Sequence, residues 1–447
     1  MARGAGAARS VNPPAPDDGG RADGAASRRA VEAVWRIESS RIVGALARYT
    51  NDFALAEDVA SEALAEALVA WPRDGVPRDP TAWLLATGRR RAIDAFRRRS
   101  GRDERYATLA RDLGEGGALT GAPGGAPDPD GDLLWDPDRI EDDRLALLFV
   151  SCHPVLAKEA RIALTLRVVG GLTSEEIARA FLVPVPTVQA RITRAKKTLA
   201  AARVPFEVPT AEDRPERLGS VLNVLYLIFS EGSTATAGDD WMRPDLAYEA
   251  VRLARVLTRL VPDEPEAHGL LALLELTAAR FAARTGPDGE PVLLEDQDRR
   301  RWDLSAILRG RSALSHAVAV GRGLGPYGLQ AAIAEQHDVA PSVAETDWER
   351  IVLLYEALGR VAPSPVVELN RAVAVSMASG PAAGLALVDD LVVREVLSGS
   401  YLLPSVRGEL LARLGRSDEA RGELELAARL CGNARERGVL ERKAAAL

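Results

Sequence analysis

The chain has 447 residues, of which 47% are hydrophobic and 27% charged, a composition typical of a globular protein with about three domains. Its formal net charge is −7 at pH 7, so any contact with nucleic acid has to depend on local clusters of cations and not on the overall charge. Two cysteines and four scattered histidines exclude a disulfide framework and argue against a metal site, and we expect no metal and no cofactor. We also expect a cytoplasmic protein without a membrane segment, because no apolar run could span a bilayer and so few cysteines suit a reducing compartment.

Residues 1–27 are rich in Ala, Gly, Pro and Arg and lack a hydrophobic segment, which predicts a disordered N-terminal arm. Apolar residues at helical spacing then predict helices over residues 28–50 and 53–71. The second helix carries carboxylates every four residues, and these form an acidic ridge: Asp58, Glu62 and Glu66. Solvated charge on a surface helix is the simplest interpretation of such a ridge.

A third helix is predicted over residues 80–99, because Asp79 is a good N-cap and a proline follows it. Two arginine triplets, residues 89–91 and 97–99, lie on its outer side, and Trp83 precedes them. Aromatic and cationic side chains beside a loop suit single-stranded DNA, because bases stack and the backbone is neutralised. Arginines that are simply solvated are the alternative interpretation.

Residues 100–137 are dominated by Gly, Pro and Asp and contain few apolar residues, which predicts a flexible acidic linker. Helical patterns resume over residues 138–152 and 157–169. They lead into residues 171–202, where the pattern predicts two short helices joined by a tight turn.

The first helix of this pair can begin with a capping box, in which Thr173 and Glu176 bond each other's backbone N–H groups. Pro184 and Pro186 end it and start a second helix, because proline disfavours helix before it and fits the first turn. The buried face of the second helix is apolar: Val188, Ile192, Ala195 and Leu199. Its outer faces carry polar and cationic residues: Thr187, Gln189, Arg191, Arg194, Lys196 and Lys197. A helix-turn-helix places such a helix in the major groove, and a helical hairpin with a solvated basic face is the alternative.

This order of elements resembles a bacterial extracytoplasmic-function (ECF) RNA polymerase sigma factor. The resemblance rests on residues 56–59 (AEDV), 83–85 (WLL) and 175–178 (EEIA). It implies sigma region 2 over residues 28–99 and sigma region 4 over residues 138–203. It also implies a non-enzymatic factor that recruits core RNA polymerase, through the β′ clamp and the β flap, to promoter DNA.

The resemblance further assigns roles to residues. Those expected to bind core polymerase are Asp58, Glu62 and Glu66. Those expected to engage the melted −10 element are Trp83, Arg89, Arg90, Asp94, Arg97 and Arg98. Those expected to contact the −35 element are Thr187, Gln189, Arg191, Arg194, Lys196 and Lys197. We expect the acidic groups that meet the polymerase and the cations that meet DNA to lie on separate helices and faces.

Residues 204–447 are helical in pattern, with helical hairpins predicted over residues 267–284, 369–391 and 402–431. Within the last of these, residues 411–420 (LARLGRSDEA) resemble the turn of a tetratricopeptide repeat (TPR). The spacing is irregular, so we expect a degenerate TPR-like solenoid, whose concave surface would bind protein segments.

This half resembles the C-terminal extension of one sigma-factor subgroup, through residues 226–232 (YLIFSEG) and 368–372 (ELNRA). The resemblance implies a regulatory domain tied to sigma activity, with a small protein of the DGPF (YCII-related) family as associated partner. Because residues 203–215 contain no long flexible joint, we expect the extension to pack on the sigma part and to regulate it.

The sequence therefore predicts an all-α protein: two small helical sigma domains joined by a flexible linker, followed by a TPR-like solenoid. Two other functions stay open, namely a helix-turn-helix operator-binding regulator with a TPR-like sensor domain, and a TPR-type scaffold without a DNA role. The polar groups that lie close together in the second half are Glu335, His337 and Asp338, and Asp239, Asp240 and Glu249. Neither group has the spacing of a nucleophile–base set or of a metal site, so we expect satisfied or solvated side chains and no enzyme.

Overall fold

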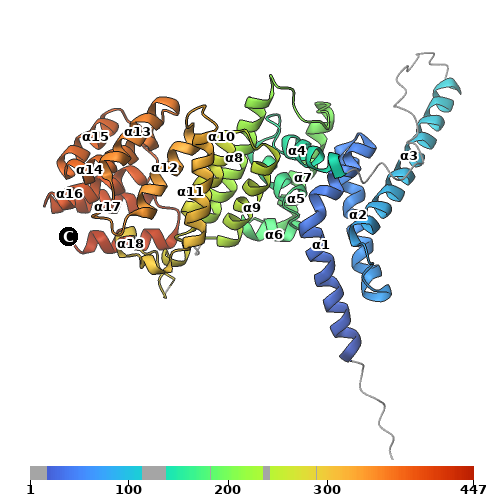
Figure 1. The fold of residues 1–447 in the computed structure, drawn as a ribbon, viewed down its shortest axis with the longest axis horizontal. Coiled ribbons are helices and arrows are strands. Elements are labelled where there is room, and N and C mark those ends of the chain that lie inside the picture. The colour runs from blue at the N-terminus through green and yellow to red at the C-terminus, as the bar shows by residue number, and fades with distance from the viewer. Residues whose placement is uncertain (1–17, 113–136, 182, 235–241, 288) are drawn as a thin grey trace, which may run out of the picture. The chain divides into compact units, whose positions relative to one another are not determined.

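The computed structural model describes the backbone of residues 18–112, 137–181, 183–234, 242–287 and 289–447, without the side chains of 18–27, 99–112 and 137–141. The chain divides into two compact units, residues 1–140 and 141–447, and each is described by itself. Within the described ranges the elements are α-helices and short 3₁₀ helices (Figure 1), and the β pairing is one isolated bridge between Thr285 and Pro291. The predicted all-α class is therefore confirmed. None of the described helices is both long and apolar enough to cross a bilayer.

The first unit is a bundle of α1 (Asp18–Thr50), α2 (Phe53–Asp74) and α3 (Pro80–Asp112), each packed on the other two. Its core is formed by large side chains that are almost completely buried: Ile42, Leu46, Trp71 and Leu84. The start of α2 is capped because the Leu55 N–H donates to Asp52 Oδ1 at 3.0 Å. The Ala82 N–H donates to Asp79 Oδ1 at 2.9 Å, as the sequence predicts for the start of α3.

Two of the predicted boundaries in this unit are wrong. Helix α1 begins at Asp18 and not at residue 28, so residues 18–27 belong to the helix and not to the disordered arm. Helix α3 ends at Asp112 and not at residue 99, so residues 100–112 of the predicted linker are helical. Residues 18–27 (DGGRADGAAS) contain no large apolar residue, and residues 100–112 contain only Tyr106 and Leu109, so a search for apolar periodicity misses both additions. The rest of the predicted arm and of the linker, residues 1–17 and 113–136, lies outside the described residues.

The second unit begins with the predicted helix-turn-helix. Its helices are α4 (Pro137–Ser151), α5 (Lys158–Val168), α6 (Ser174–Ala180) and α7 (Val185–Ala201). The capping box is present: the Glu176 N–H donates to Thr173 Oγ1 at 3.1 Å, and the Thr173 N–H donates to Glu176 Oε2 at 2.8 Å. Pro184 is the N-cap of α7 and Pro186 lies in its first turn, which confirms the predicted break.

The rest of the unit is a row of helices that follow one another in space in the order of the chain (Figure 1). They are α8 (Arg214–Ser233), α9 (Pro244–Leu260), α10 (Pro265–Ala278), α11 (Leu304–Ala319), α12 (Pro326–Val339), α13 (Trp348–Val361), α14 (Pro365–Ser379), α15 (Pro381–Val393), α16 (Leu402–Arg413), α17 (Ser417–Leu430) and α18 (Ala434–Ala445). One apolar cluster joins α10 to α13 and another joins α14 to α17. The last helix turns back, because Arg435 Nη1 and Arg442 Nη2 each lie 2.9 Å from a carboxylate oxygen of Glu290.

Two of the three predicted hairpins correspond to helix pairs, α14 with α15 and α16 with α17. In the second pair Gly415 takes a positive φ of 75°, which glycine adopts without strain. The hairpin predicted over residues 267–284 is wrong, because α10 is followed by the 3₁₀ turn η2 (Phe281–Ala283). Helix α10 is buried on most sides and packs on α9, α11 and α12, so its partners come from both directions along the chain. Residues 141–447, which contain the predicted boundary at residue 204, form one compact unit.

Candidate polymerase and nucleic-acid interfaces

The acidic ridge of α2 faces solvent at Asp58 and Glu62 and is half-buried at Glu66. Glu66 is paired with the first arginine triplet of α3: Arg90 Nη2 lies 3.3 Å from its Oε1 and Arg91 Nη2 lies 2.8 Å from its Oε2. Arg91 Nε is also 3.9 Å from Glu62 Oε2. The two helices are consecutive and joined by a short loop, so they run antiparallel and bring the ridge opposite the triplet.

The predicted separation of acidic and cationic groups is therefore wrong at this point. Arg90, which was expected on the DNA side, is bonded to Glu66, which was expected on the polymerase side. Such exposed ion pairs contribute little to stability, because water screens them. A larger partner can displace them, so the pairing leaves both groups available to a ligand while it balances their charge in the free protein.

The other predicted residues of α3 divide into a packed set and an exposed set. The Arg89 guanidinium lies 5.4 Å from the centre of the Tyr49 ring, and the ring of Trp83 packs edge-on against Trp71 at 5.7 Å. Arg97 and Arg98 are exposed farther along the helix. Arg97 Nη1 is 4.0 Å from Asp94 Oδ1, at the limit of an ion pair, so the outer part of α3 presents cations to solvent.

Helix α7 has one apolar face and one polar face, as predicted. Val188, Ile192, Ala195 and Leu199 are buried. Gln189, Arg194 and Lys197 are exposed. Thr187, Arg191 and Lys196 are half-buried at the edges of the polar face. Side chains with amide, guanidinium and ammonium groups thus line one side of a helix that follows a tight turn, the geometry with which a recognition helix meets base edges and phosphates.

Side chains of helix α8, in the extension, donate hydrogen bonds to backbone carbonyls at the C-terminal end of α4. The Ser220 hydroxyl donates to the Cys152 carbonyl at 2.5 Å, and Arg217 Nη2 donates to the Phe149 carbonyl at 3.0 Å. Arg161, on α5, donates in turn to Ser220 Oγ at 2.9 Å. These bonds satisfy carbonyls at the C-terminal end of α4, which have no partner within their own helix.

Helix α9 and the residue before it bond two carbonyls that precede α6 and the carbonyl of its last residue. Arg252 Nη2 donates to the carbonyls of Val169 and Gly170, at 3.4 and 3.3 Å, and to Glu249 Oε1 at 2.6 Å. Arg243 donates to the Ala180 carbonyl at 2.9 Å and is also paired with Glu231. Guanidinium groups are favourable at the C-terminal ends of helices, where the carbonyl dipoles concentrate negative charge.

These two arginines were not predicted. Their acceptors are backbone carbonyls 63 and 82 residues away, so no local spacing in the sequence identifies them. The charged residues of α9 recur every three or four positions and form one continuous face, which by itself predicts only a solvated surface.

The polar groups of the extension were predicted to be satisfied or solvated, and Glu335 and Glu249 are each paired with an arginine. Glu335 is paired with Arg311 at 2.8 Å, and the side chain of Asp338 is fully buried, with Arg280 Nε 3.5 Å from its Oδ1. Burial raises the pKa of Asp338 to about 7, and burial lowers the pKa of His337 to about 4. Asp239 and Asp240 lie outside the described residues, and Glu249 is paired with Arg252. Within the ranges that the structure describes, no three His, Cys, Asp or Glu side chains are grouped so that they could hold a metal ion.

Three families match the chain. Residues 36–102 match "Sigma-70 region 2", residues 146–199 match "Sigma-70, region 4", and residues 217–318 match a family of unknown function, DUF6596. An uncharacterized protein of Rhizobium meliloti (strain 1021) is 45% identical over 406 residues, which cover 88% of this chain and 90% of the relative. No solved structure matches.

The first two matches coincide with the two places where the geometry suits polymerase and DNA. Region 2 contains the ridge and the arginine triplets of α2 and α3, and region 4 contains the helix-turn-helix of α6 and α7. Proteins with both regions bind core RNA polymerase and recognise promoter DNA. The chain belongs to the sigma-70 family of transcription initiation factors, as a member with a long helical extension after region 4.

Proposed function

We propose that the protein is an alternative sigma factor of the ECF type, which acts in the cytoplasm and directs core polymerase to a restricted set of promoters. The observation that carries the proposal is the polar face of α7, which presents Gln189, Arg194 and Lys197 to solvent above a fully apolar inner face. Arginine and glutamine can form bidentate bonds with guanine and adenine edges, and lysine neutralises phosphate. In this proposal Thr187, Gln189, Arg191 and Arg194 approach −35 bases, and Lys196 and Lys197 bind phosphate.

In region 2 we assign the polymerase contact to Asp58, Glu62 and Glu66, and the −10 contact to the side chains along α3. The latter are Trp83, Arg89, Arg90, Asp94, Arg97 and Arg98. The exposed position of Arg97 and Arg98 supports their part in this assignment. In this proposal the ion pairs of Arg90 and Arg91 with Glu66 have to break before α2 can bind the polymerase clamp or α3 can bind DNA.

We further propose that the extension, a TPR-like helical array, modulates the sigma activity through region 4. The bonds of Arg243 and Arg252 to the carbonyls around α6 support this, because they connect the extension to the turn that orients α7. The resemblance of the extension to that of one sigma subgroup supports a small DGPF (YCII-related) protein as its associated partner. A chain that ends near Val204 lacks both arginines, and we expect its promoter output to differ from that of the full chain.

Run-off transcription with purified core polymerase, on a promoter selected from random DNA by the full-length protein, tests the proposal. Arg191→Ala should lower promoter affinity by about 1–3 kcal/mol if the guanidinium is bidentate to a base. Arg259→Ala is the matched control, because it removes the same charge from an exposed position on α9. An Arg191→Ala protein that initiates as well as the wild type would contradict the assignment of the −35 contact.

A further inference from the structure

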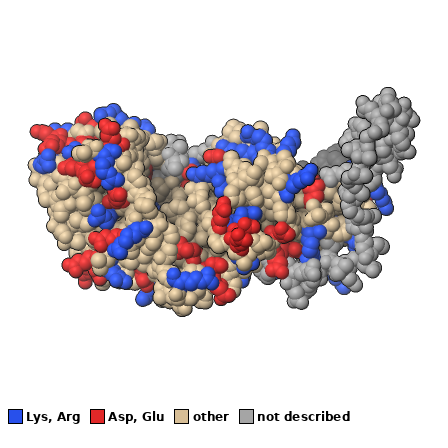
Figure 2. All heavy atoms as spheres, turned by 90° about the horizontal axis from the view of Figure 1, so that it is seen from above, with Lys and Arg blue, Asp and Glu red and all other residues tan. Residues whose placement is uncertain are grey.

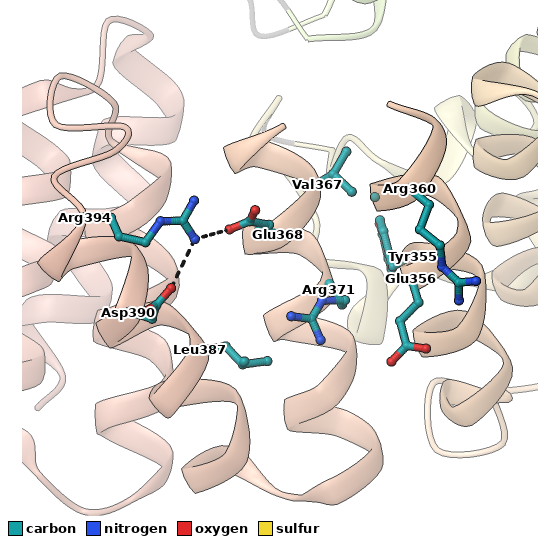
Figure 3. Close-up of a pocket in the computed structure, with 10 residues that line it drawn as sticks. Tyr355, Glu356, Arg360, Val367, Glu368, Arg371, Leu387, Asp390 and Arg394 are labelled. Atoms are coloured by element: carbon teal, nitrogen blue, oxygen red, sulfur yellow. Dashed lines mark hydrogen bonds and ion pairs between the residues drawn. The ribbon is translucent and has the colours of Figure 1, made fainter. Parts of the chain in front are cut away.

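A groove crosses three consecutive helices of the extension, α13, α14 and α15 (Figure 3). Its cavity volume is about 430 Å³, within the range of about 300–1,000 Å³ that is usual for ligand sites. In Figure 3 the helix that carries Glu368 and Arg371 lies between the helix with Glu356 and Arg360 and the helix with Asp390. Helix α14 is thus the floor, and α13 and α15 are the two walls.

The charges at the α15 side of the groove are already paired. Arg394 Nη1 lies 2.7 Å from Glu368 Oε2 and 3.1 Å from Asp390 Oδ2 (dashed in Figure 3). One guanidinium therefore bridges two carboxylates, which leaves this side with an excess of negative charge. An anionic ligand would not be held here.

The two other arginines that line the groove have no such partners. Arg371 is half-buried on the floor and Arg360 is exposed on the wall, and neither forms an ion pair within the described ranges of the chain. A guanidinium has five N–H donors and no acceptor, and one that is partly withdrawn from water binds an acceptor strongly. The planar fork of arginine fits a carboxylate with two parallel bonds.

Apolar surface adjoins these cations. Tyr355, Val367 and Leu387 line the groove, and burial raises the pKa of the Tyr355 phenol from its ordinary value to about 12. The position where Gly359 would carry a side chain is open space, which leaves the wall above the groove uncovered. A ligand that bonds Arg371 can therefore place apolar atoms against neighbouring side chains.

The remaining charges decide the class of ligand. Glu356, Glu368 and Asp390 also line the groove, and they would repel a nucleic acid, which carries a phosphate at every nucleotide. On the face drawn in Figure 2, Lys and Arg are interspersed with Asp and Glu over the C-terminal helices, without the continuous cationic track that a nucleic acid requires. An isolated carboxylate within an otherwise uncharged chain meets the arginines without this repulsion.

We propose that the groove binds a peptide segment of a partner protein, which presents a single carboxylate to Arg371 and Arg360 and apolar side chains to Tyr355, Val367 and Leu387. This inference goes beyond promoter recognition, because it concerns residues far along the chain from the helix-turn-helix. Stacked helical repeats commonly bind extended protein segments in this way. The recognised group is the carboxylate of a Glu or Asp side chain that is flanked by apolar residues.

Arrays of short C-terminally amidated peptides, in matched pairs that differ only by Glu or Gln at the central position, test the proposal with the full-length protein. Some pairs should bind with a preference of about tenfold or more for Glu, measured afterwards by fluorescence anisotropy. Arg371→Gln should abolish this preference, and Arg371→Lys should retain part of it, because lysine keeps the charge but not the fork. Arg360→Gln should weaken binding without affecting the packed floor.

Arg350→Gln is the control, because Arg350 is exposed on α13 but does not line the groove, and it should bind as the wild type does. The proposal is overturned if no peptide pair discriminates Glu from Gln, or if Arg371→Gln and Arg360→Gln both bind like Arg350→Gln. Displacement of the peptide by a short single-stranded oligonucleotide of mixed sequence would overturn it as well, since the groove would then be a nucleic-acid site. The assay contains no polymerase or promoter, so its failure is distinct from a failure of the sigma function.

Discussion

Replacing Arg252 with alanine should loosen the segment that leads from α5 into the helix-turn-helix. In the native chain this guanidinium bonds the carbonyls of Val169 and Gly170 and two oxygens of Glu249. The side chain of Glu249 is only 9% exposed, so the substitution removes its ion-pair partner in a place that water reaches poorly. Alanine replaces none of these bonds.

The size of the effect follows from the geometry. Hydrogen bonds to charged groups contribute about 1.5–3 kcal/mol each, but the two bonds to the carbonyls are long, and the Arg252 side chain is 37% exposed. We therefore expect local opening of residues 169–180 to become easier by about 2 kcal/mol, or about 30-fold. Binding to −35 DNA should weaken in parallel, because α6 and its turn orient α7.

Hydrogen exchange with mass spectrometry measures this directly. Peptides that cover residues 169–180 should exchange faster in Arg252→Ala, and peptides from α13 to α15 should not change. Arg259→Ala is the control on the same helix, because among the described residues its side chain bonds only a carbonyl of its own helix, that of Arg255 at 3.3 Å. Exchange in residues 169–180 that equals that of the wild type would refute the reasoning that α9 holds the helix-turn-helix.

Two further predictions concern the extension. Gly232→Ala should lower the melting temperature sharply, because the added Cβ would lie 2.4 Å from the backbone nitrogen of Ala247. Gly219→Ala, on the same helix but with open space around it, should stabilise the protein by about 1 kcal/mol. Equal melting curves for the two variants would contradict the close packing of α8 on α9. Burial raises the pKa of Asp338 to about 7 from about 3.9 in the unfolded chain, so between these values the folded state binds more protons and stability falls as pH rises. The melting temperature of Asp338→Asn should accordingly rise relative to that of the wild type between about pH 4 and about pH 8, and a constant difference would show that Asp338 does not titrate in this range.

The parts of the structure that were predicted are those fixed by local chemistry. The capping box of Thr173 and Glu176 and the apolar face of α7 need only neighbours within one or two turns, so spacing alone identified them. The pairing of Arg90 with Glu66 was missed because it depends on how two helices face each other, a property of the folded bundle and not of either helix.

The anchoring of α6 by Arg243 and Arg252 was missed for a related reason. Their acceptors are main-chain carbonyls, which every residue has, so the sequence gives no sign of which ones are chosen. The hairpin over residues 267–284 was wrongly predicted because α10 is apolar on most of its surface. Such a helix indicates burial without indicating which partners bury it.

The central claim is that regions 2 and 4 of this chain make it a polymerase-dependent reader of promoter DNA. Size-exclusion chromatography of the purified full-length protein with core RNA polymerase, at low and at physiological salt, tests it most directly. We expect co-elution in a complex that then protects a selected promoter from nuclease digestion around the −35 and −10 positions. Separate elution at both salt concentrations, with promoter protection by the protein alone, would contradict the claim and favour an operator-binding regulator.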